Sequence, residues 1–149
     1  MYTISELEEF RKIINNSKRA VFFGGAGVST ESGIPDFRSQ DGLYNQKYAY
    51  PPEYILSATF FHTHTAEFFD FYREKMIFPS AKPNAAHFKL AQWEREGKLA
   101  AVVTQNIDGL HQAAGSKNVF ELHGSVWRNY CTRCGKSYSA EFILGSKRV

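Results

Sequence analysis

The sequence predicts an α/β protein with a Rossmann-like parallel sheet, although only part of such a sheet is readable in it. Three short apolar, β-rich runs carry this prediction, at residues 20–23, 99–104 and 119–122. Continuous apolar runs of this length are typical of strands buried on both faces, as in a helix-covered parallel sheet. Each run ends in a polar, glycine-bearing motif, and ligands of open α/β sheets bind beyond the carboxyl ends of the strands. We therefore expect the three motifs to converge on one ligand site.

A helix is expected before the first strand. Thr3 and Glu6 have the spacing of a capping box, and apolar residues then recur at helical spacing until residues 15–16. We expect this helix to pack against the rest of the fold and to carry no chemistry.

The segment between the first two strands is dense in phenylalanine and tyrosine. Residues 42–82 are therefore predicted to form a small helical module with its own core, and an aromatic-lined cleft is the alternative for single rings. A further helix, from residues 83–84 to Gly97, leads into the second strand and gives strand–helix–strand alternation. Structural roles are expected for His62, His64 and His87.

Composition narrows the function classes. The chain of 149 residues has 18 basic and 15 acidic side chains, a net charge of +3, and no basic run long enough for a nucleic-acid footprint. No signal peptide and no apolar stretch of membrane-spanning length is readable. We therefore expect a cytoplasmic protein with reduced thiols, and no specific nucleic-acid or membrane partner.

The motif after the first strand predicts an anion site. In Gly25-Ala26-Gly27, a tight turn would expose backbone N–H groups that suit a diphosphate. The match to a dinucleotide fingerprint is imperfect because Thr30 occupies the third glycine position, so a plain glycine turn is the alternative. Gly33 and Pro35 then force a loop that carries an aromatic residue and an arginine.

The motif after the second strand crowds amides and a carboxylate into residues 105–108. A tight Asn-Ile-Asp-Gly turn is the structural interpretation, and a polar ligand site is the functional one.

The motif after the third strand places His123 before Gly124-Ser125, where the imidazole can project into the crevice. Histidine, with an ordinary pKa of about 6.5, suits general-base chemistry at neutral pH. A structural strand-end histidine is the alternative.

The cysteines, Cys131 and Cys134, have the spacing of one zinc knuckle. A structural zinc site closes with four ligands, so this pair would supply half of one. A redox pair is the rival, but it normally lies in a βαβ unit, and residues 127–130 show no strand signal.

Together these motifs resemble the sirtuin family of NAD-dependent protein-lysine deacylases, of the bacterial kind. The resemblance rests on residues 25–38, 104–111, 121–125 and 131–134, in the family's order, with Gly24 replacing the usual threonine. It covers the N-terminal portion of the family's catalytic core, and it implies a second cysteine pair and further strands that this sequence does not contain.

The resemblance also implies a reaction and the residues that perform it. An acyl group would pass from a lysine of a protein or peptide to the ADP-ribose of NAD, with release of nicotinamide. Catalytic roles fall on His123, Asn106 and Asp108. NAD contacts fall on Gly25, Ala26, Gly27, Thr30, Phe37, Arg38, Gln105, Asn106, Ile107, Asp108 and His123, and structural Zn²⁺ on Cys131 and Cys134.

The implied organisation is one sirtuin-type catalytic domain over residues 1–149, in three modules. Its Rossmann-like parts are expected at about 1–41 and 83–126, the helical module at about 42–82 and a partial zinc module at about 127–149. Two alternatives to the deacylase remain at this stage: a truncated NAD-binding fragment without turnover, and a mono-ADP-ribosyltransferase.

Overall fold

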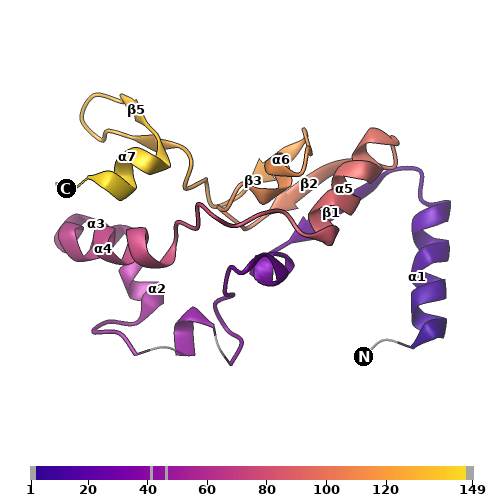
Figure 1. Ribbon diagram of the computed structural model, residues 1–149, viewed down its shortest axis with the longest axis horizontal. Helices are drawn as coiled ribbons and strands as arrows, with labels where there is room; N and C mark the ends of the chain where they lie inside the picture. The colour runs from indigo at the N-terminus through magenta and orange to yellow at the C-terminus, as the bar shows by residue number, and fades with distance from the viewer. Residues whose placement is uncertain (1–2, 41, 46, 147–149) are drawn as a thin grey trace.

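The computed structural model describes residues 3–40, 42–45 and 47–146. The molecule is elongated, with a parallel sheet and its helices at one end and a group of short helices at the other (Figure 1). Loops at the carboxyl ends of the strands lie between these two parts.

The sheet has three parallel strands in the order β1-β2-β3: β1 at Ala20–Gly24, β2 at Leu99–Thr104 and β3 at Val119–Glu121. Thr104 pairs with both neighbours at the same level, so all three strands end at one edge. The α/β prediction and the positions of the three strands are therefore confirmed.

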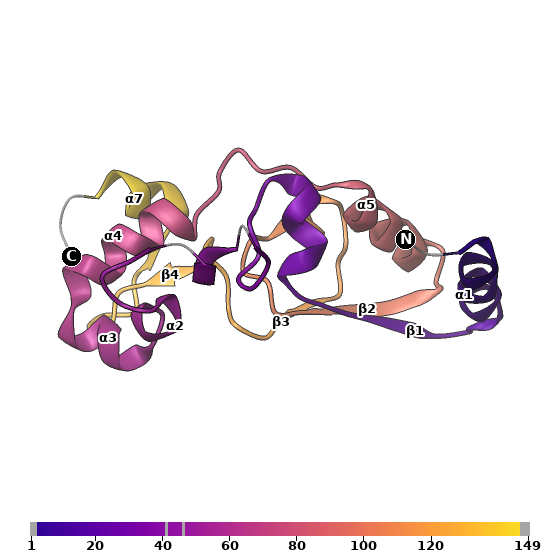
Figure 2. The same cartoon turned by 90° about the horizontal axis from the view of Figure 1, so that it is seen from below.

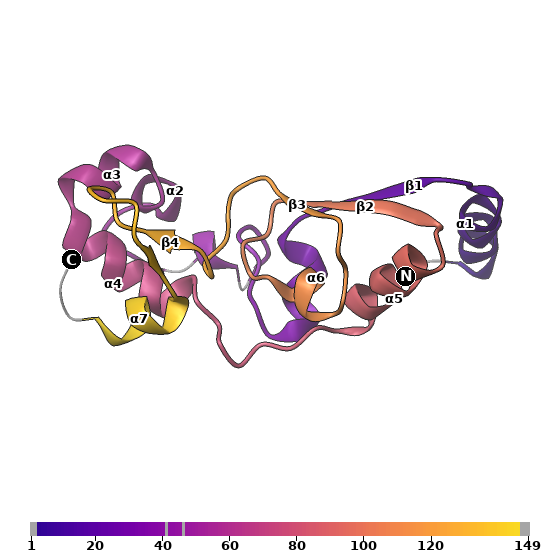
Figure 3. The ribbon, with the colours of Figure 1, turned by 90° about the horizontal axis from the view of Figure 1, so that it is seen from above.

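Helical segments cover one face of this sheet. They are the 3₁₀ helix η1 (Ala26–Ser32), α5 (Ala85–Arg95) and the short α6 (Leu110–Ala113). Asn84 caps α5 with its side chain, and Leu90 packs on Leu99 and Val102 in the core of this part. Figure 2 shows α5 beside one face of β1 and β2, and Figure 3 shows α5 and α6 on the same side of the strands.

The opposite face of the sheet is bare among the described residues, so the expectation of strands buried on both faces is wrong. Val21, Phe23, Phe120 and Leu122 are each more than half exposed on β1 and beside or within β3. These side chains alternate with inward-facing ones, as the strand pleat requires. Their apolar character suits a second covering layer, which none of the described elements provides.

The N-terminal helix α1 (Ile4–Asn16) forms as predicted but does not pack. Thr3 and Glu6 make the reciprocal capping-box bonds. None of its residues is buried, however, and Ile4, Leu7 and Phe10 are all more than half exposed. Capping and helical spacing fix a helix locally, whereas packing also requires an apolar surface opposite its stripe.

The second part of the molecule consists of helices and a small hairpin. Its elements are η2 (Leu43–Asn45), α2 (Pro52–Ile55), α3 (Ala58–Thr63), α4 (Thr65–Lys75), β4 (Asn129–Tyr130), β5 (Ser137–Tyr138) and α7 (Ala140–Gly145). Ile55, Phe60 and Phe71 form a core among the helices, as the aromatic density predicted. Val126 and Ala140 pack with Ile77 in a second cluster. None of the described helices has the length and apolar character needed to span a membrane.

The bare sheet face leads to a first prediction. We expect the purified chain to self-associate and to bind an apolar dye, because large exposed apolar patches promote association. Phe120→Lys should reduce self-association and dye binding. The unfolding free energy should change by only about 0.5 kcal/mol, as for most exposed positions. Light scattering after gel filtration, dye fluorescence and urea unfolding measure these effects.

Phe88→Lys is the matched control, since Phe88 is similarly exposed but lies on α5. Equal association of both variants and the unmodified chain would show that the sheet face does not drive self-association.

Candidate functional site

A cavity of about 640 Å³ lies beyond the carboxyl ends of the three strands. It brings together eight residues that the sequence singled out, namely Ala26, Phe37, Arg38, Gln105, Asn106, Ile107, Asp108 and His123. They come from the loops after β1, β2 and β3, so the expected convergence of the three motifs on one site is observed.

Three predicted cofactor residues lie near this cavity but outside its lining: Gly25, Gly27 and Thr30. Gly25 lies against the Gln105 side chain, since a Cβ there would be 3.3 Å from Gln105 Oε1. Thr30 is exposed, and its hydroxyl donates to the Gly27 carbonyl at 3.0 Å. Their role in cofactor binding stays a prediction.

Ser29 is a site residue that the sequence reasoning missed. It is fully buried, lines the cavity and donates a hydrogen bond from Oγ to Asp108 Oδ2 at 2.7 Å. The glycine motif after β1 predicts a tight turn, but the segment forms the 3₁₀ helix η1, in which residues three apart face the same way. Ala26 and Ser29 have that spacing, and both face the cavity.

Asp108 is the centre of a hydrogen-bond network in the cavity wall. Its Oδ2 accepts from Ser29 and from Asn106 Nδ2, the latter at 3.2 Å, and its Oδ1 accepts from the Leu110 N–H at 2.9 Å. Asn106 also donates to Ser29 Oγ at 3.0 Å, and its own N–H donates to Thr104 Oγ1. These hydrogen bonds connect the loop after β2 to η1. They also hold the side chains of Asp108, Asn106 and Ser29, which form the polar end of the cavity.

The helical part supplies much of the apolar wall. Leu43, Tyr44, Leu56, Met76 and Phe78 line the cavity together with Ile34 and Pro35. The Phe37 and Tyr44 rings meet at 5.4 Å between centroids. The sequence reasoning had not assigned these residues to the site. Aromatic density indicates a core, but it does not show which side chains also face a neighbouring loop.

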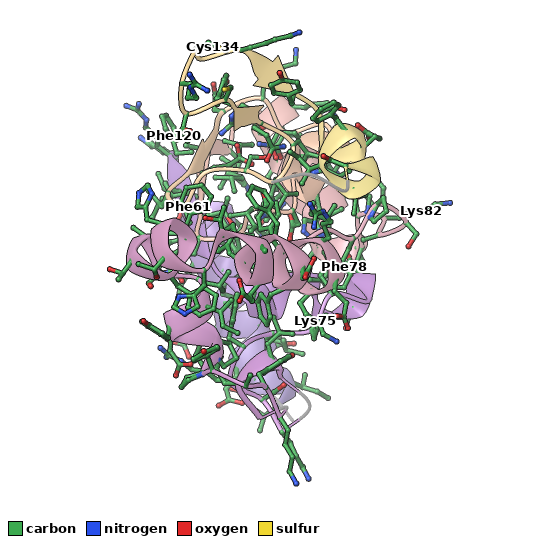
Figure 4. All side chains as sticks on the ribbon, turned by 90° about the vertical axis from the view of Figure 1, so that its left-hand side faces the viewer. Phe61, Lys75, Phe78, Lys82, Phe120 and Cys134 are labelled. Carbon is green, nitrogen blue, oxygen red and sulfur yellow. The ribbon has the colours of Figure 1, made fainter. Side chains whose placement is uncertain are left out.

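Basic side chains also lie at this wall. Arg38 and Lys75 both line the cavity, and Figure 4 shows Lys75 and Phe78 near the end of α4. Lys75 Nζ donates to Glu74 Oε1 at 2.8 Å, and this bond raises the pKa of the amine. The Asp36 carboxylate lines the cavity as well, so side chains of both charges lie beside its apolar walls and its polar end.

His123 lies two residues after the end of β3, before Gly124 with a φ of 80°. It is exposed and lines the cavity, and no protein group in the described part of the chain hydrogen-bonds its imidazole. Both ring nitrogens are thus open to a ligand, which suits the predicted role as a base.

Two other histidines are buried beneath the site. His87 and His111 face each other with 4.7 Å between ring centroids, and each is almost fully buried. Burial lowers the pKa of both, that of His111 to about 4, despite the opposing attraction of Asp108. His87 Nδ1 also lies 3.0 Å from Asn84 Oδ1, within the cap of α5. The structural role predicted for His87 agrees with this position, and both rings are neutral at pH 7.

This pair predicts a pH-dependent stability. Because the pKa of His111 is lower in the folded chain than in the unfolded one, the unfolded chain binds more protons between pH 4 and 6.5. The unfolding free energy should therefore fall as the pH is lowered through this window, by at most about 1.4 kcal/mol per pH unit for each histidine. Urea unfolding at a series of pH values measures the slope.

His111→Phe should flatten that slope, while His62→Ala, which changes an exposed histidine, should leave it intact. The same slope in His111→Phe and the unmodified chain would contradict the assignment.

Cys131 and Cys134 lie in the turn between β4 and β5, both as free thiols, with Cys134 at the outer end of this hairpin (Figure 4). Backbone N–H groups of Arg133 and Cys134 hydrogen-bond the Cys131 sulfur and lower the pKa of its thiol. Such bonds favour the thiolate that zinc binds. Among the described residues, no group of three or more histidine, cysteine or carboxylate side chains is placed to hold a metal.

The hairpin also bears on the redox alternative for this pair. The short strand β4 precedes Cys131, although the sequence showed no strand signal there. β4 pairs antiparallel with β5, so the cysteines join two strands of a hairpin and not a strand and a helix of a βαβ unit.

Comparison with known proteins shows that the fold of this chain is similar to that of solved structures. A Sir2 structure with a deacetylated p53 peptide and 3′-O-acetyl ADP ribose superposes with a TM-score of 0.83 at 49% identity, covering 91% of this chain and 54% of the other. The structure of Sir2Tm bound to a propionylated peptide gives a TM-score of 0.76 at 46% identity, covering 91% of this chain and 52% of the other.

Proteins with similar sequences indicate the same family as the solved structures. NAD-dependent protein deacetylases of Clostridium acetobutylicum and Clostridium perfringens are 62% and 60% identical over 99% and 97% of this chain. The matched parts are 61% and 60% of those proteins, so the chain spans about 60% of the length of these curated relatives. The profile of the Sir2 family matches residues 25–148. On this match and these identities, the chain belongs to the Sir2 family.

Proposed function

We propose that the chain takes part in NAD-dependent deacylation of protein lysine, with transfer of the acyl group to ADP-ribose and release of nicotinamide. The observation that carries this proposal is the convergence of eight predicted NAD-site residues on one cavity in a Sir2-family chain. The names of the curated relatives, and the deacetylated and propionylated peptides in the solved structures, support an acylated protein or peptide as the substrate.

NAD would lie across the cavity from Ala26 and Arg38 to Asp108. The diphosphate suits the backbone N–H groups at the start of η1, beside Ala26, with Arg38 nearby. The nicotinamide carboxamide suits Asp108 and the Ile107 backbone, where the Ser29 and Asn106 side chains hold the Asp108 carboxylate in place. Phe37 and Ile107 would shield the reacting ribose carbon from water.

His123 would act as the general base. The acyl-lysine oxygen would displace nicotinamide from the ribose carbon, and His123 would take a proton from the ribose hydroxyl that captures the acyl group. The amine would then leave as free lysine, and one water molecule would supply the missing hydroxyl. The products would be nicotinamide, O-acyl-ADP-ribose and free lysine. The open ring nitrogens of His123 at the cavity wall support this role.

We also propose a structural Zn²⁺ at Cys131 and Cys134, in a compartment with reduced thiols such as the cytoplasm. The backbone N–H bonds to the Cys131 sulfur and the hairpin turn suit two of the four ligands of a tetrahedral ion. The metal would stabilise the hairpin, and no step of the reaction needs it.

The test supplies NAD and an acetylated-lysine peptide to the chain and detects products by mass spectrometry. O-acetyl-ADP-ribose together with free lysine peptide is expected for a deacylase. ADP-ribose on the peptide would instead indicate mono-ADP-ribosyl transfer. NAD binding without any product would indicate that the chain is an NAD-binding fragment without turnover.

A chimera serves as a second sample, with the chain joined to the part of the Clostridium acetobutylicum relative that it does not cover. Turnover by the chimera alone would show that this chain holds the NAD site but needs further elements for catalysis. No NAD binding by either sample would overturn the proposal.

A further inference from the structure

We propose that Trp127 is a positioning residue that fixes the His123 loop, residues 122–128, against the Asp108 loop, residues 105–109. That these loops matter for a reaction rests on the proposed function. The contacts between the loops are observed in the structure and do not depend on that proposal. Trp127 lies outside the cavity lining, so its effect on the site is exerted through the two loops.

The contact between the loops is specific. The indole Nε1–H of Trp127 donates to the Asp108 carbonyl at 2.7 Å, and the next residue back, Val126, donates its N–H to the Ile107 carbonyl at 3.0 Å. Two successive residues of one loop thus bond two successive carbonyls of the other. This arrangement sets how far His123 lies from the Asp108 network.

Gly109 makes the close approach possible. Its φ is 74°, and a Cβ at this position would lie 2.8 Å from both Cδ1 and Nε1 of the indole. The indole therefore packs directly on the glycine backbone. Since side chains rarely adopt this φ and the space is filled, Gly109 and Trp127 fit as a pair.

Other contacts also hold the His123 loop. Arg128 Nη1 donates to the nearly buried Glu121 carboxylate at 2.6 Å, and the Leu122 N–H donates to the Thr104 carbonyl at 2.9 Å. Val126 is buried in a cluster with Ile77, against which Ile107 packs. Among the described residues, the indole N–H makes the side-chain hydrogen bond from this loop to the Asp108 loop.

The test replaces the donor and keeps an aromatic ring. Trp127 is 38% exposed, so Trp127→Phe leaves no large cavity and should fold. We expect the Val126 amide to exchange with deuterium about five-fold faster in this variant, which equals about 1 kcal/mol, the net value of one typical hydrogen bond. Trp127→Leu should do the same, and it serves if the Phe variant does not fold.

Trp93→Phe is the matched control, because Trp93 packs in the core at Leu90, Leu99 and Val102, away from these loops. It should leave Val126 exchange unchanged. Equal Val126 exchange in Trp127→Phe, Trp93→Phe and the unmodified chain would overturn the proposal.

A second readout distinguishes positioning from simple packing. With NAD and acetylated peptide, Trp127→Phe should lower kcat about ten-fold while the KM for NAD changes less than about two-fold, because misplaced groups slow the reaction without removing a ligand contact. Faster exchange with unchanged kcat would show a merely structural tryptophan. If the unmodified chain and the chimera turn over no NAD, the proposed function fails, and the exchange rates alone decide whether Trp127 docks the loops.

Discussion

We expect His123→Ala to lower the deacylation rate by about 10²–10⁴-fold, the usual contribution of a general base, and to change NAD affinity by less than about three-fold. His123 lies at the cavity wall, is exposed and has no protein partner for its imidazole in the described residues. Its removal therefore breaks no internal contact. Calorimetry with NAD and product analysis with an acetylated peptide measure the two quantities.

His62→Ala is the control for this variant, since it removes an exposed histidine from the last turn of α3. It should retain both turnover and affinity. Turnover by His123→Ala at the unmodified rate would exclude His123 as the base. A parallel loss of NAD affinity would indicate a binding role instead.

Much of the sheet could be predicted because its strands are short, apolar and followed by glycine-bearing motifs. The second strand runs from Leu99 to Thr104 as expected, and the others differ by one residue at an end. The convergence of the motifs followed from topology alone, because parallel strands bring their carboxyl ends to one edge.

Features that depend on tertiary partners could not be predicted in the same way. The apolar stripe of α1 and the outward side chains of β1 and β3 indicate burial, yet they are exposed because no described element lies opposite them. A residue pattern indicates that one face of a helix or sheet is apolar, but it does not show which element covers that face. Ser29 was missed for a local reason, since a glycine motif predicts a tight turn and does not indicate the 3₁₀ helix η1 that follows.

The role of Asp108 is also clearer in the structure than in the sequence. A tight turn and a polar ligand site are the alternatives that the sequence leaves for residues 105–108. The turn is observed, and ligand binding stays a prediction. Asp108 Oδ1 accepts from the Leu110 N–H, as in an Asx turn, and Oδ2 holds the Ser29 and Asn106 side chains at the cavity.

Asp108→Asn should therefore have a large effect on both stability and ligand choice. Ser29 and Asn106 donate to one carboxylate oxygen and Leu110 donates to the other, so an amide N–H meets a donor in either orientation. The loss of a hydrogen bond to a charged group predicts a fall of about 1.5–3 kcal/mol in the unfolding free energy. Urea unfolding measures this change.

Nicotinamide binding should weaken by at least about ten-fold in Asp108→Asn, and ADP-ribose binding much less, because only nicotinamide carries the carboxamide assigned to this end of the cavity. Asp70→Asn is the control, an exposed carboxylate on α4 that pairs with Arg73. It should change neither affinity. Equal losses of nicotinamide and ADP-ribose affinity in Asp108→Asn would show that Asp108 only shapes the turn, because a structural fault in the wall affects every ligand of the cavity alike.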